Sequence, residues 1–348
     1  MRVKITDIAR LARVSTGTVD RVIHKRGEVS EKTRTKVERI LIELNYQPDI
    51  LARTLASKRT WTFSVLMPVS ANGNDFWSAP LKGIEKALSE ISPFGVRINY
   101  YFFNQFDRES FAAKALDLLS DSPDSVLFAP VFVNDSMKFI EGCKLRKIHI
   151  TLFNSLIDEL AGIPYIGQNS HQSGMVAARL LSYGIHEPGD ILIINLASGK
   201  DYNHIIKREK GFRDFFLQNK ISSFNLHTID FNTATDEIIG QNLPRTFEEL
   251  DVKGIYVTNS RVYKVADFLE SKAIKGSKLI GYDLLPGNIE YLRNGTIDFL
   301  ISQRPEEQAY KGIIQIFNEL ILNKNPETLH FIPVDIITRE NIENYQYR

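Results

Sequence analysis

The sequence has little or none of several features that define common classes of protein. It contains one cysteine, Cys143, which excludes an internal disulfide and gives no sign of an oxidising compartment. It contains no run of about eighteen consecutive apolar residues, so we expect no membrane-spanning helix and no membrane partner. The N-terminus is polar and charged from Arg2 and Lys4 onward, so no secretory signal is visible and a cytoplasmic location is expected.

Sequence signatures of catalysis and of cofactor binding are also missing. There is no glycine-rich phosphate loop ending in Lys-Ser/Thr, no Gly-x-Gly-x-x-Gly after a strand and no Gly-x-Ser-x-Gly. The seven histidines are scattered without the spacing of metal ligands. Acidic pairs such as Asp158-Glu159 and Glu248-Glu249 are typical of surface charge. We therefore expect no enzyme, no cofactor and no metal site.

Charge divides the 348-residue chain unevenly. Residues 1–60 contain 14 Lys and Arg but 7 Asp and Glu, whereas the remainder contains 29 and 35. A basic head on a mildly acidic body favours a polyanionic partner for the head alone, although a solvated basic surface explains the charge equally well. The length exceeds one ordinary core, so two or three domains are expected.

The head has the pattern of a helix-turn-helix. A first helix is expected from Ile5 to Ala12, with Thr6 as its N-cap, Ile8, Leu11 and Ala12 on one face and a small Ala9 at the helix crossing. A turn at Arg13-Val14 precedes a second helix over 16–23, which Ser15 caps and which buries Val19, Val22 and Ile23. A third helix begins near Ser30 and Thr33, and its apolar face is Val37, Ile40, Leu41 and Leu44.

The head resembles the LacI/GalR family of bacterial repressors. Five motifs in fixed order carry the resemblance: Ile5-Thr6-Asp7-Ile8-Ala9, Val14-Ser15-x-x-Thr18-Val19-x-Arg21-Val22, Val29-Ser30-x-x-Thr33-Arg34-x-x-Val37, Leu44-Asn45-Tyr46-x-Pro48 and Ala52-x-x-Leu55-Ala56. This order favours the resemblance over a purely structural three-helix domain. The resemblance implies a DNA-binding domain over 1–48 and double-stranded operator DNA as partner.

The resemblance places Thr16, Gly17 and Arg21 where the recognition helix meets base edges. Arg21 is the strong reader, since a guanidinium can clamp guanine O6 and N7, whereas Gly17 has no side chain. Phosphate contacts are implied for Thr6, Ser15, Thr18, Ser30, Thr33 and Arg34. The chain departs from the family at Asp20, where a small hydroxyl residue is usual, and at Arg13, where the turn glycine is usual.

A hinge is implied over 49–60. In the family this segment forms a helix only on DNA, and paired hinge helices of a homodimer enter the minor groove. Leu55 matches the leucine that wedges between base steps, and Ala52 and Ala56 match the small residues at which the two hinges touch. An ordinary amphipathic linker helix is the alternative, and Asp49 departs from the usual asparagine.

The body, residues 61–348, alternates strand-like and helix-like segments, which predicts doubly wound α/β lobes. Expected strands are 62–67, 96–103, 125–129, 149–153, 165–166, 190–196, 224–229, 254–257, 278–282, 299–302 and 329–334. Expected helices include 78–91, 108–120, 135–144, 172–183, 208–219, 262–270, 287–293 and 305–322. Two lobes are expected, an N-lobe of about 61–166 and 304–333 and a C-lobe of about 167–303 and 334–348.

The body resembles the periplasmic sugar-binding-protein fold that the same family uses. Polar and aromatic residues that match its ligand positions are Asn74, Phe76, Trp77, Asn154, Arg208, Asn259, Asp283 and Gln303, with Phe231 as a further candidate ring wall. Paired aromatics suit a pyranose face, and the mixed donors and acceptors suit neighbouring hydroxyls. We also expect Arg208 and Asp283 to pair in the empty site. Core packing of the aromatics and structural ion pairs of Arg208 and Asp283 are the alternatives.

The sequence thus predicts a homodimeric repressor of carbohydrate-utilisation genes that a sugar or sugar derivative releases from its operator. A corepressor-dependent regulator that senses a purine, a nucleoside or a partner protein is the first alternative. A catalytic body on a DNA-binding head is the second, and no nucleophile–base pair or metal set supports it.

Overall fold

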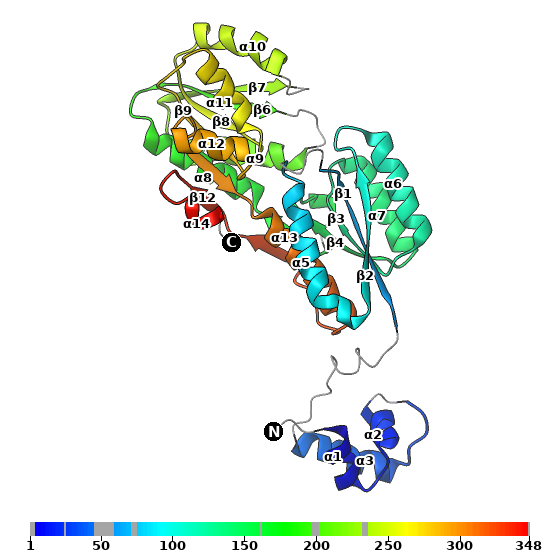
Figure 1. Cartoon of the computed structure of the whole chain (residues 1–348). Helices are drawn as coiled ribbons and strands as arrows, with labels where there is room; N and C mark the ends of the chain where they lie inside the picture. The colour runs from blue at the N-terminus through cyan, green and yellow to red at the C-terminus, as the bar shows by residue number, and fades with distance from the viewer. Residues whose placement is uncertain are drawn as a thin grey trace. The chain divides into compact units, whose positions relative to one another are not determined.

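The computed structural model describes residues 4–23, 26–44, 59–70, 75–160, 162–196, 202–231 and 236–346. The chain forms two compact units, Met1–Ser57 and Lys58–Arg348. We call them the head and the body and describe each by itself (Figure 1). No helix within these described ranges is long and apolar enough to span a membrane.

The head contains three short helices around a small apolar core. They are α1 (Ile5–Ala12), α2 (Thr16–Ile23) and α3 (Glu31–Glu43). The buried core side chains are Ile8, Ala9, Ala12, Val19, Val22, Val37 and Ile40. Ser15 and Ser30 cap α2 and α3 as predicted, because their hydroxyls accept the backbone N–H of Thr18 at 3.1 Å and of Thr33 at 3.4 Å.

Two expectations for the first helix are wrong. The N-cap is Lys4 rather than Thr6, and the Asp7 carboxylate accepts the backbone N–H of Lys4 at 3.0 Å. Ala9 joins Ile8 and Ala12 in the core, whereas Leu11, expected on the apolar face, is 53% exposed. The Asp7 carboxylate, rather than the Thr6 hydroxyl, thus accepts a backbone N–H at the start of α1.

Arg13 ends α1 in the left-handed conformation, with φ of 57°. The Val14 N–H bonds to the carbonyl of Ala9 at 3.0 Å, as in a Schellman C-cap. The family's usual glycine has no steric penalty in this conformation, whereas an L-residue with a Cβ is disfavoured by roughly 1–2 kcal/mol. The departure at Arg13 therefore leaves the turn geometry in place at some energetic cost.

The body contains two six-stranded sheets. The strands of the first sheet are β1 (Trp61–Pro68), β2 (Val96–Phe103), β3 (Ser125–Phe128), β4 (His149–Phe153), β5 (Tyr165–Gln168) and β11 (Leu329–Ile332). Those of the second are β6 (Gly189–Leu196), β7 (Phe224–Phe231), β8 (Val252–Val257), β9 (Lys278–Tyr282), β10 (Phe299–Ser302) and β12 (Asp335–Ile337). The orders are β11-β5-β4-β3-β1-β2 and β12-β10-β9-β8-β6-β7, and every pairing is parallel except that of β12.

Helices cover both faces of each sheet. In the first, or N-lobe, they are α5 (Ser78–Ile91), α6 (Arg108–Asp121), α7 (Val133–Leu145) and α13 (Pro305–Leu320), with the short 3-10 helices η1 (Ser92–Phe94) and η2 (Asp158–Leu160). In the second, or C-lobe, they are α8 (Ser170–Gly184), α9 (Asn203–Gln218), α10 (Asp236–Glu249), α11 (Val262–Ser271), α12 (Pro286–Asn294) and α14 (Glu343–Gln346). This is the predicted doubly wound α/β architecture.

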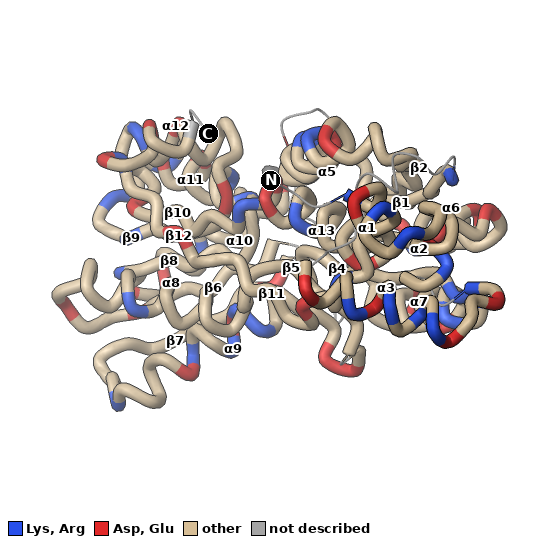
Figure 2. Tube along the Cα trace, turned by 90° about the horizontal axis from the view of Figure 1, so that it is seen from below, with Lys and Arg blue, Asp and Glu red and all other residues tan. Residues whose placement is uncertain are grey.

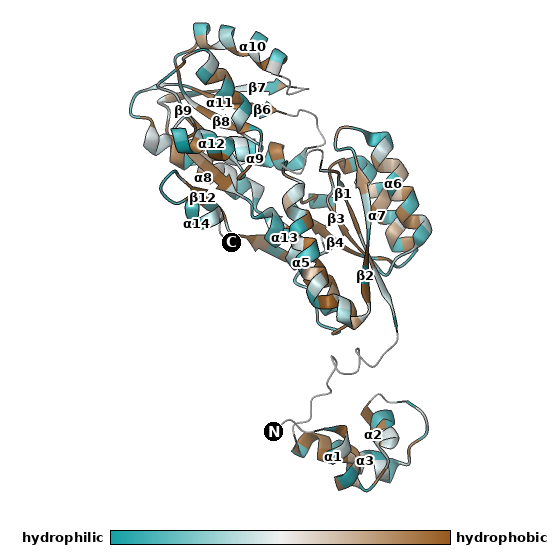
Figure 3. Ribbon diagram, viewed as in Figure 1, coloured by the Kyte–Doolittle hydropathy of each residue, from teal (hydrophilic) through white to brown (hydrophobic). Residues whose placement is uncertain are grey.

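Alternation along the central strands divides each core into two layers. In β1, Phe63, Val65 and Met67 pack with α5 and α13, whereas Leu66 packs with α6 and α7. In β6, alternate residues likewise face α8 and α9 or α10, α11 and α12. The central strands are accordingly hydrophobic along their length in Figure 3, as expected for strands buried on both faces.

The chain passes between the lobes three times. It crosses after β5, after β10 and between β11 and β12, at Asn169, Arg304 and Pro333. Parallel strands put their carboxyl ends at one edge of each sheet, which is where ligands bind in such folds. The carboxyl ends of β5 and β10 therefore lie directly beside the crossings at Asn169 and Arg304, where a ligand site is expected.

Candidate functional site

The head exposes the side chains that the sequence predicts for DNA contact. Thr6, Ser15, Thr16, Gly17, Arg21, Ser30 and Arg34 are exposed, and Thr18 and Thr33 are half-buried. The hydroxyls of Ser15 and Thr18 lie 3.0 Å apart, and those of Ser30 and Thr33 lie 2.8 Å apart. These hydroxyls therefore already serve the helix N-termini that would face a phosphate. Ala52, Leu55 and Ala56 lie outside the described residues.

Arg21 lies in the last turn of α2 with its side chain exposed. A Cβ added to Gly27 would lie 3.6 Å from Arg21 Cδ, so this glycine borders the arginine stem without crowding it. Figure 2 shows Lys and Arg positions on all three head helices. Arg21 thus presents an exposed guanidinium on a head whose helices carry further Lys and Arg residues.

A cavity in the body gathers the residues that the sequence predicts for ligand binding. Its empty space, part of it open to solvent, amounts to about 780 Å³. Of the predicted residues, Phe76, Trp77, Asn154, Arg208, Asn259, Asp283 and Gln303 line it. Asn74 lies outside the described residues. Phe231 packs in the C-lobe core and is not part of the lining, so its prediction as a ring wall is wrong.

Arg208 is the most deeply placed charged group of the cavity, with 1% of the residue exposed. Nη1 donates to the carbonyl of Thr258 at 2.7 Å and Nη2 to Gln303 Oε1 at 2.5 Å. The guanidinium carbon lies 3.7 Å from the centre of the Tyr282 ring. Nε is buried and has no hydrogen-bond partner among the described residues, so one donor of this arginine stays unsatisfied.

Asp283 and Arg208 are joined through an amide rather than directly. Gln303 Nε2 donates to Asp283 Oδ2 at 2.7 Å while its Oε1 accepts from Arg208. The expected direct pairing of Arg208 with Asp283 is therefore wrong, because the Gln303 amide lies between them and bonds to both. Burial raises the pKa of Asp283 to about 6, although Arg208 and Gln303 act to lower the same pKa.

The two asparagines of the lining differ in whether their side-chain amides are already hydrogen-bonded within the protein. Asn259 Nδ2 donates to the carbonyl of Leu196 at 2.9 Å, and its Oδ1 accepts the backbone N–H of Arg261 at 3.1 Å. Its amide thus shapes the loop between β8 and α11. Asn154 has φ of 68° and donates its backbone N–H to Gln308 Oε1 at 3.1 Å, and among the described residues its side chain makes no hydrogen bond.

The two aromatics also differ. Trp77 is 5% exposed, packs edge-on to Phe76 and to Phe153, and donates Nε1–H to Gln105 Oε1 at 3.1 Å. It is mainly a core residue whose edge reaches the cavity. Phe76 is half-buried, so more of its surface remains for a ligand.

The structure adds lining residues that the sequence reading missed. They include Gln105, Phe106, Tyr202, His204, Ser260 and Arg261. Burial lowers the pKa of His204 to about 3, and Arg208 acts in the same direction, so this imidazole is neutral at physiological pH. Arg261 follows Asn259 by two residues, and that proximity was the one available signal in the sequence.

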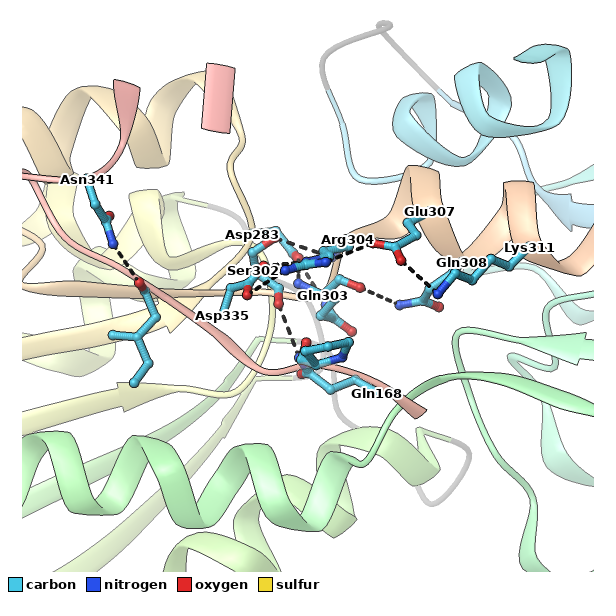
Figure 4. A network of polar contacts seen from close by, with 12 residues as sticks. Gln168, Asp283, Ser302, Gln303, Arg304, Glu307, Gln308, Lys311, Asp335 and Asn341 are labelled. Carbon is cyan, nitrogen blue, oxygen red and sulfur yellow. Dashed lines mark hydrogen bonds and ion pairs between the residues drawn. The ribbon is translucent and has the colours of Figure 1, made fainter. Parts of the chain in front are cut away.

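A polar network links the cavity to the three crossings (Figure 4). Gln168 Nε2 donates to the carbonyls of Ser302 at 3.1 Å and Pro333 at 3.4 Å. Arg304 clamps Asp335 through Nε at 2.5 Å and Nη2 at 2.9 Å, and its Nη1 donates to Glu307 at 3.0 Å. Because Gln303 precedes Arg304, the cavity and this network share one stretch of backbone.

Both parts of the chain match known families. Residues 4–49 match the bacterial regulatory proteins of the lacI family, and residues 64–324 match the periplasmic binding protein domain. The chain belongs to the LacI family of transcriptional regulators. Within the described residues of this LacI-family chain, no group of three or more His, Cys, Asp or Glu could hold a metal ion.

Relatives of this LacI-family chain include catabolite control protein A of Staphylococcus epidermidis and of Staphylococcus xylosus. Each is 34% identical over 138 residues, which is 40% of this chain and 40% of the relative. The chain therefore aligns with well under half the length of these curated relatives.

Solved structures resemble the body of the LacI-family chain. A candidate LacI transcriptional regulator from Bacteroides fragilis has a TM-score of 0.75 and 30% identity over 82% of this chain and all of the other. A solute-binding protein from Burkholderia graminis in complex with D-arabinose has a TM-score of 0.73 and 18% identity, covering 83% of this chain and 99% of that one. The second likeness is one of fold.

Proposed function

We propose that this LacI-family regulator is a homodimeric, cytoplasmic and non-catalytic repressor of carbohydrate-utilisation genes that leaves its operator when the body binds a sugar or sugar derivative. The observation that carries the proposal is the chain of hydrogen bonds from Arg208 through Gln303 to Asp283 on one cavity wall. Such a row of a donor, an amide and an acceptor suits adjacent sugar hydroxyls. The half-buried Phe76 can cover an apolar ring face.

The position of Gln303 supports coupling between the ligand and the lobes. It lies at the end of β10, directly before the crossing at Arg304. A ligand that bonds to Arg208 and Asp283 would alter the contacts of the amide between them and so bias the angle between the lobes. Coupling free energies of about 1–3 kcal/mol suffice to change DNA occupancy several-fold to a hundredfold, and the coupling is reciprocal.

The head supplies the DNA contacts in this proposal. Arg21 would clamp a guanine, while α2 and α3 direct their N-termini toward phosphates. Two heads in a dimer would neutralise several phosphates, so operator affinity should fall steeply as salt concentration rises. The hinge residues Ala52, Leu55 and Ala56 would complete the minor-groove contact.

The test measures binding of full-length protein to its operator by fluorescence anisotropy while candidate sugars are titrated. We expect at least one sugar to release wild-type protein, and Asp283→Asn and Arg208→Lys to retain operator binding but lose release. Arg245→Ala, which removes an exposed arginine on α10, is the matched control and should release normally. Release that survives both cavity substitutions would remove this cavity from the mechanism. A ligand that tightens operator binding would instead favour the corepressor alternative.

A further inference from the structure

Arg261 is an arginine of the cavity wall that is held in place but keeps part of its guanidinium unused. It directly precedes α11, and its backbone N–H donates to Asn259. Nη1 donates to the carbonyl of Leu196 at 3.3 Å, and the guanidinium carbon lies 4.9 Å from the centre of the Phe106 ring. The end of β6 and an aromatic ring of the cavity therefore fix the side chain.

The edge formed by Nε and Nη2 of Arg261 makes no hydrogen bond with any described residue, and the guanidinium forms no ion pair within that part of the chain. Burial lowers the pKa of Arg261, and the groups that raise the same pKa are the phenols of Tyr263 and Tyr202 rather than a carboxylate. An unpaired charge that is partly removed from water carries a desolvation cost. An anionic ligand group would offset that cost.

The other charges of the lining do not neutralise Arg261. Asp283 is bound by Gln303, which also binds Arg208, so these two charges are compensated within one chain of hydrogen bonds. The remaining lining carboxylate, Asp75, forms no ion pair with Arg261 and is not among the groups that raise its pKa. The cavity therefore offers a positive position on its C-lobe wall.

Another arginine of the body, Arg304, binds a carboxylate through its Nε–Nη2 edge. Arg304 uses Nε and Nη2 together to hold the two oxygens of Asp335, at 2.5 and 2.9 Å. The two parallel N–H groups match the spacing of a planar carboxylate. Arg261 has the same pair of donors, and the residue lines the cavity.

We infer that the effector is an acidic sugar whose carboxylate docks on the Nε–Nη2 edge of Arg261 while its hydroxyls bind the Arg208–Gln303–Asp283 chain. Hexuronates and aldonates have this chemistry. The inference rests on the proposed sugar-sensing function and narrows its ligand class. A carboxylate matches the single charge of Arg261, whereas a phosphate ester carries a charge of about −1.5 to −2 at pH 7 that this one guanidinium does not balance.

Calorimetric titration of the full-length protein with matched pairs tests the inference. The pairs are glucose with glucuronate, galactose with galacturonate and glucose with gluconate, and glucose 6-phosphate and galactose 1-phosphate form the phosphate arm. For the preferred pair we expect the acid to bind at least about tenfold more tightly than the neutral sugar, since bonds to charged groups contribute about 1.5–3 kcal/mol. A phosphate ester that binds more tightly than every sugar acid overturns the carboxylate assignment.

Substitutions at position 261 separate this inference from the proposed function. Arg261→Gln should remove the preference for the acid while neutral-sugar affinity persists, and Arg261→Lys should retain only part of the preference because lysine lacks the fork. Lys272→Gln removes an exposed cation at the other end of α11 and should retain the full preference.

The two possible failures have different signatures. If a neutral sugar binds as tightly as its acid, or if Arg261→Gln keeps the preference, the Arg261 site is overturned while the sugar sensor stands. If no neutral sugar and no sugar acid binds folded wild-type protein, the proposed sugar-sensing function is overturned and the inference with it. Thermal unfolding of each unliganded variant verifies that it folds.

Discussion

At the scale of single residues, Asp283 is a cavity carboxylate whose burial opposes its negative charge. It is 2% exposed and adopts φ of 68° directly after β9. Gln303 donates to its carboxylate through the side chain, and Arg208 adds a favourable charge, but burial outweighs both and raises the pKa to about 6. The charged form is therefore less favourable in the folded chain than in the unfolded chain, where an Asp pKa is about 3.9.

The sign of this shift makes a prediction for stability. The folded protein holds the Asp283 proton between about pH 4 and pH 6 while the unfolded chain releases it, so the Asp283 contribution falls as pH rises through that window. A shift of about two pKa units corresponds to at most about 3 kcal/mol. Asp283→Asn should lack this loss, so the variant should gain free energy of unfolding relative to wild type from pH 4 to pH 7.

Urea unfolding of both proteins at pH 4, 5, 6 and 7 provides the measurement. The difference between the two proteins is the informative quantity, because Glu209 and Glu307 have lowered pKa values and make both proteins less stable in acid. Parallel stability curves for the two proteins would contradict the assigned shift.

At the scale of elements, the close packing of α8 on α9 sets the depth of Arg208. A Cβ on Gly174 would lie 2.0 Å from the carbonyl oxygen of Arg208, and a Cβ on Gly211 would lie 1.9 Å from that of His171. The two backbones thus approach so closely that neither position has room for a side chain. This contact holds the turn of α9 that carries Arg208 against the sheet.

Gly211→Ala should push α9 away from α8 and move Arg208 out of register with Thr258 and Gln303. We expect a loss of about 1–3 kcal/mol in the free energy of unfolding, as for overpacked core sites, together with weaker ligand binding. Gly240→Ala on α10 is the matched control, since nothing lies within 4 Å of its added Cβ. That change should be neutral or slightly stabilising. Chemical unfolding and ligand titration measure both effects, and equal stability of the two variants would refute the packing argument.

The sequence predicts most elements of the body but misses three features for identifiable reasons. Helix α10 contains Gly240 and Pro244, two residues that argue against a helix interior. Helix α9 begins at Asn203 rather than at Arg208, because tertiary packing extends it beyond the clear apolar periodicity. The expected strand 329–334 divides at Pro333 into β11 and β12, which belong to different sheets.

The structure brings together predicted residues that follow a local motif, whereas the sequence does not indicate the lining residues that only the fold brings close. Arg208, Asp283 and Gln303 follow recognisable local patterns and meet in the structure. Phe106 and Arg261 come from loops of different lobes with no shared motif, and the bridging role of Gln303 depends on distances that a linear pattern does not contain.

At the scale of the body as a whole, the two lobes are joined by three crossings that share polar contacts. Arg304, at the start of α13, holds Asp335 on β12, so this ion pair connects two crossings. Arg304 also binds Glu307, which in turn pairs with Lys311 at 2.8 Å. Both carboxylates are partly buried, so salt should screen this network less than an exposed pair.

Asp335→Asn should weaken the contact between Arg304 and β12, while the ion pair between Arg304 and Glu307 remains. We expect about 2–4 kcal/mol of lost stability, because removing one member of a partly buried pair leaves the other incompletely compensated. Effector affinity should change as well, because the preferred angle between the lobes changes. The controls are Glu343→Gln, which breaks the more exposed pair with Arg293, and urea unfolding in low and high salt. Equal losses for both variants would contradict a special role for the crossing.

The side chain of Gln168 connects all three crossings between the lobes. Its amide Nε2 donates to the carbonyls of Ser302 and Pro333. One buried side chain beside the first crossing is therefore hydrogen-bonded to the backbone at the other two. Small rotations about this amide would preserve both of its hydrogen bonds, whereas sliding of one crossing past another would break them. A small rotation of this kind would displace the far ends of both lobes most, because displacement grows with distance from the amide.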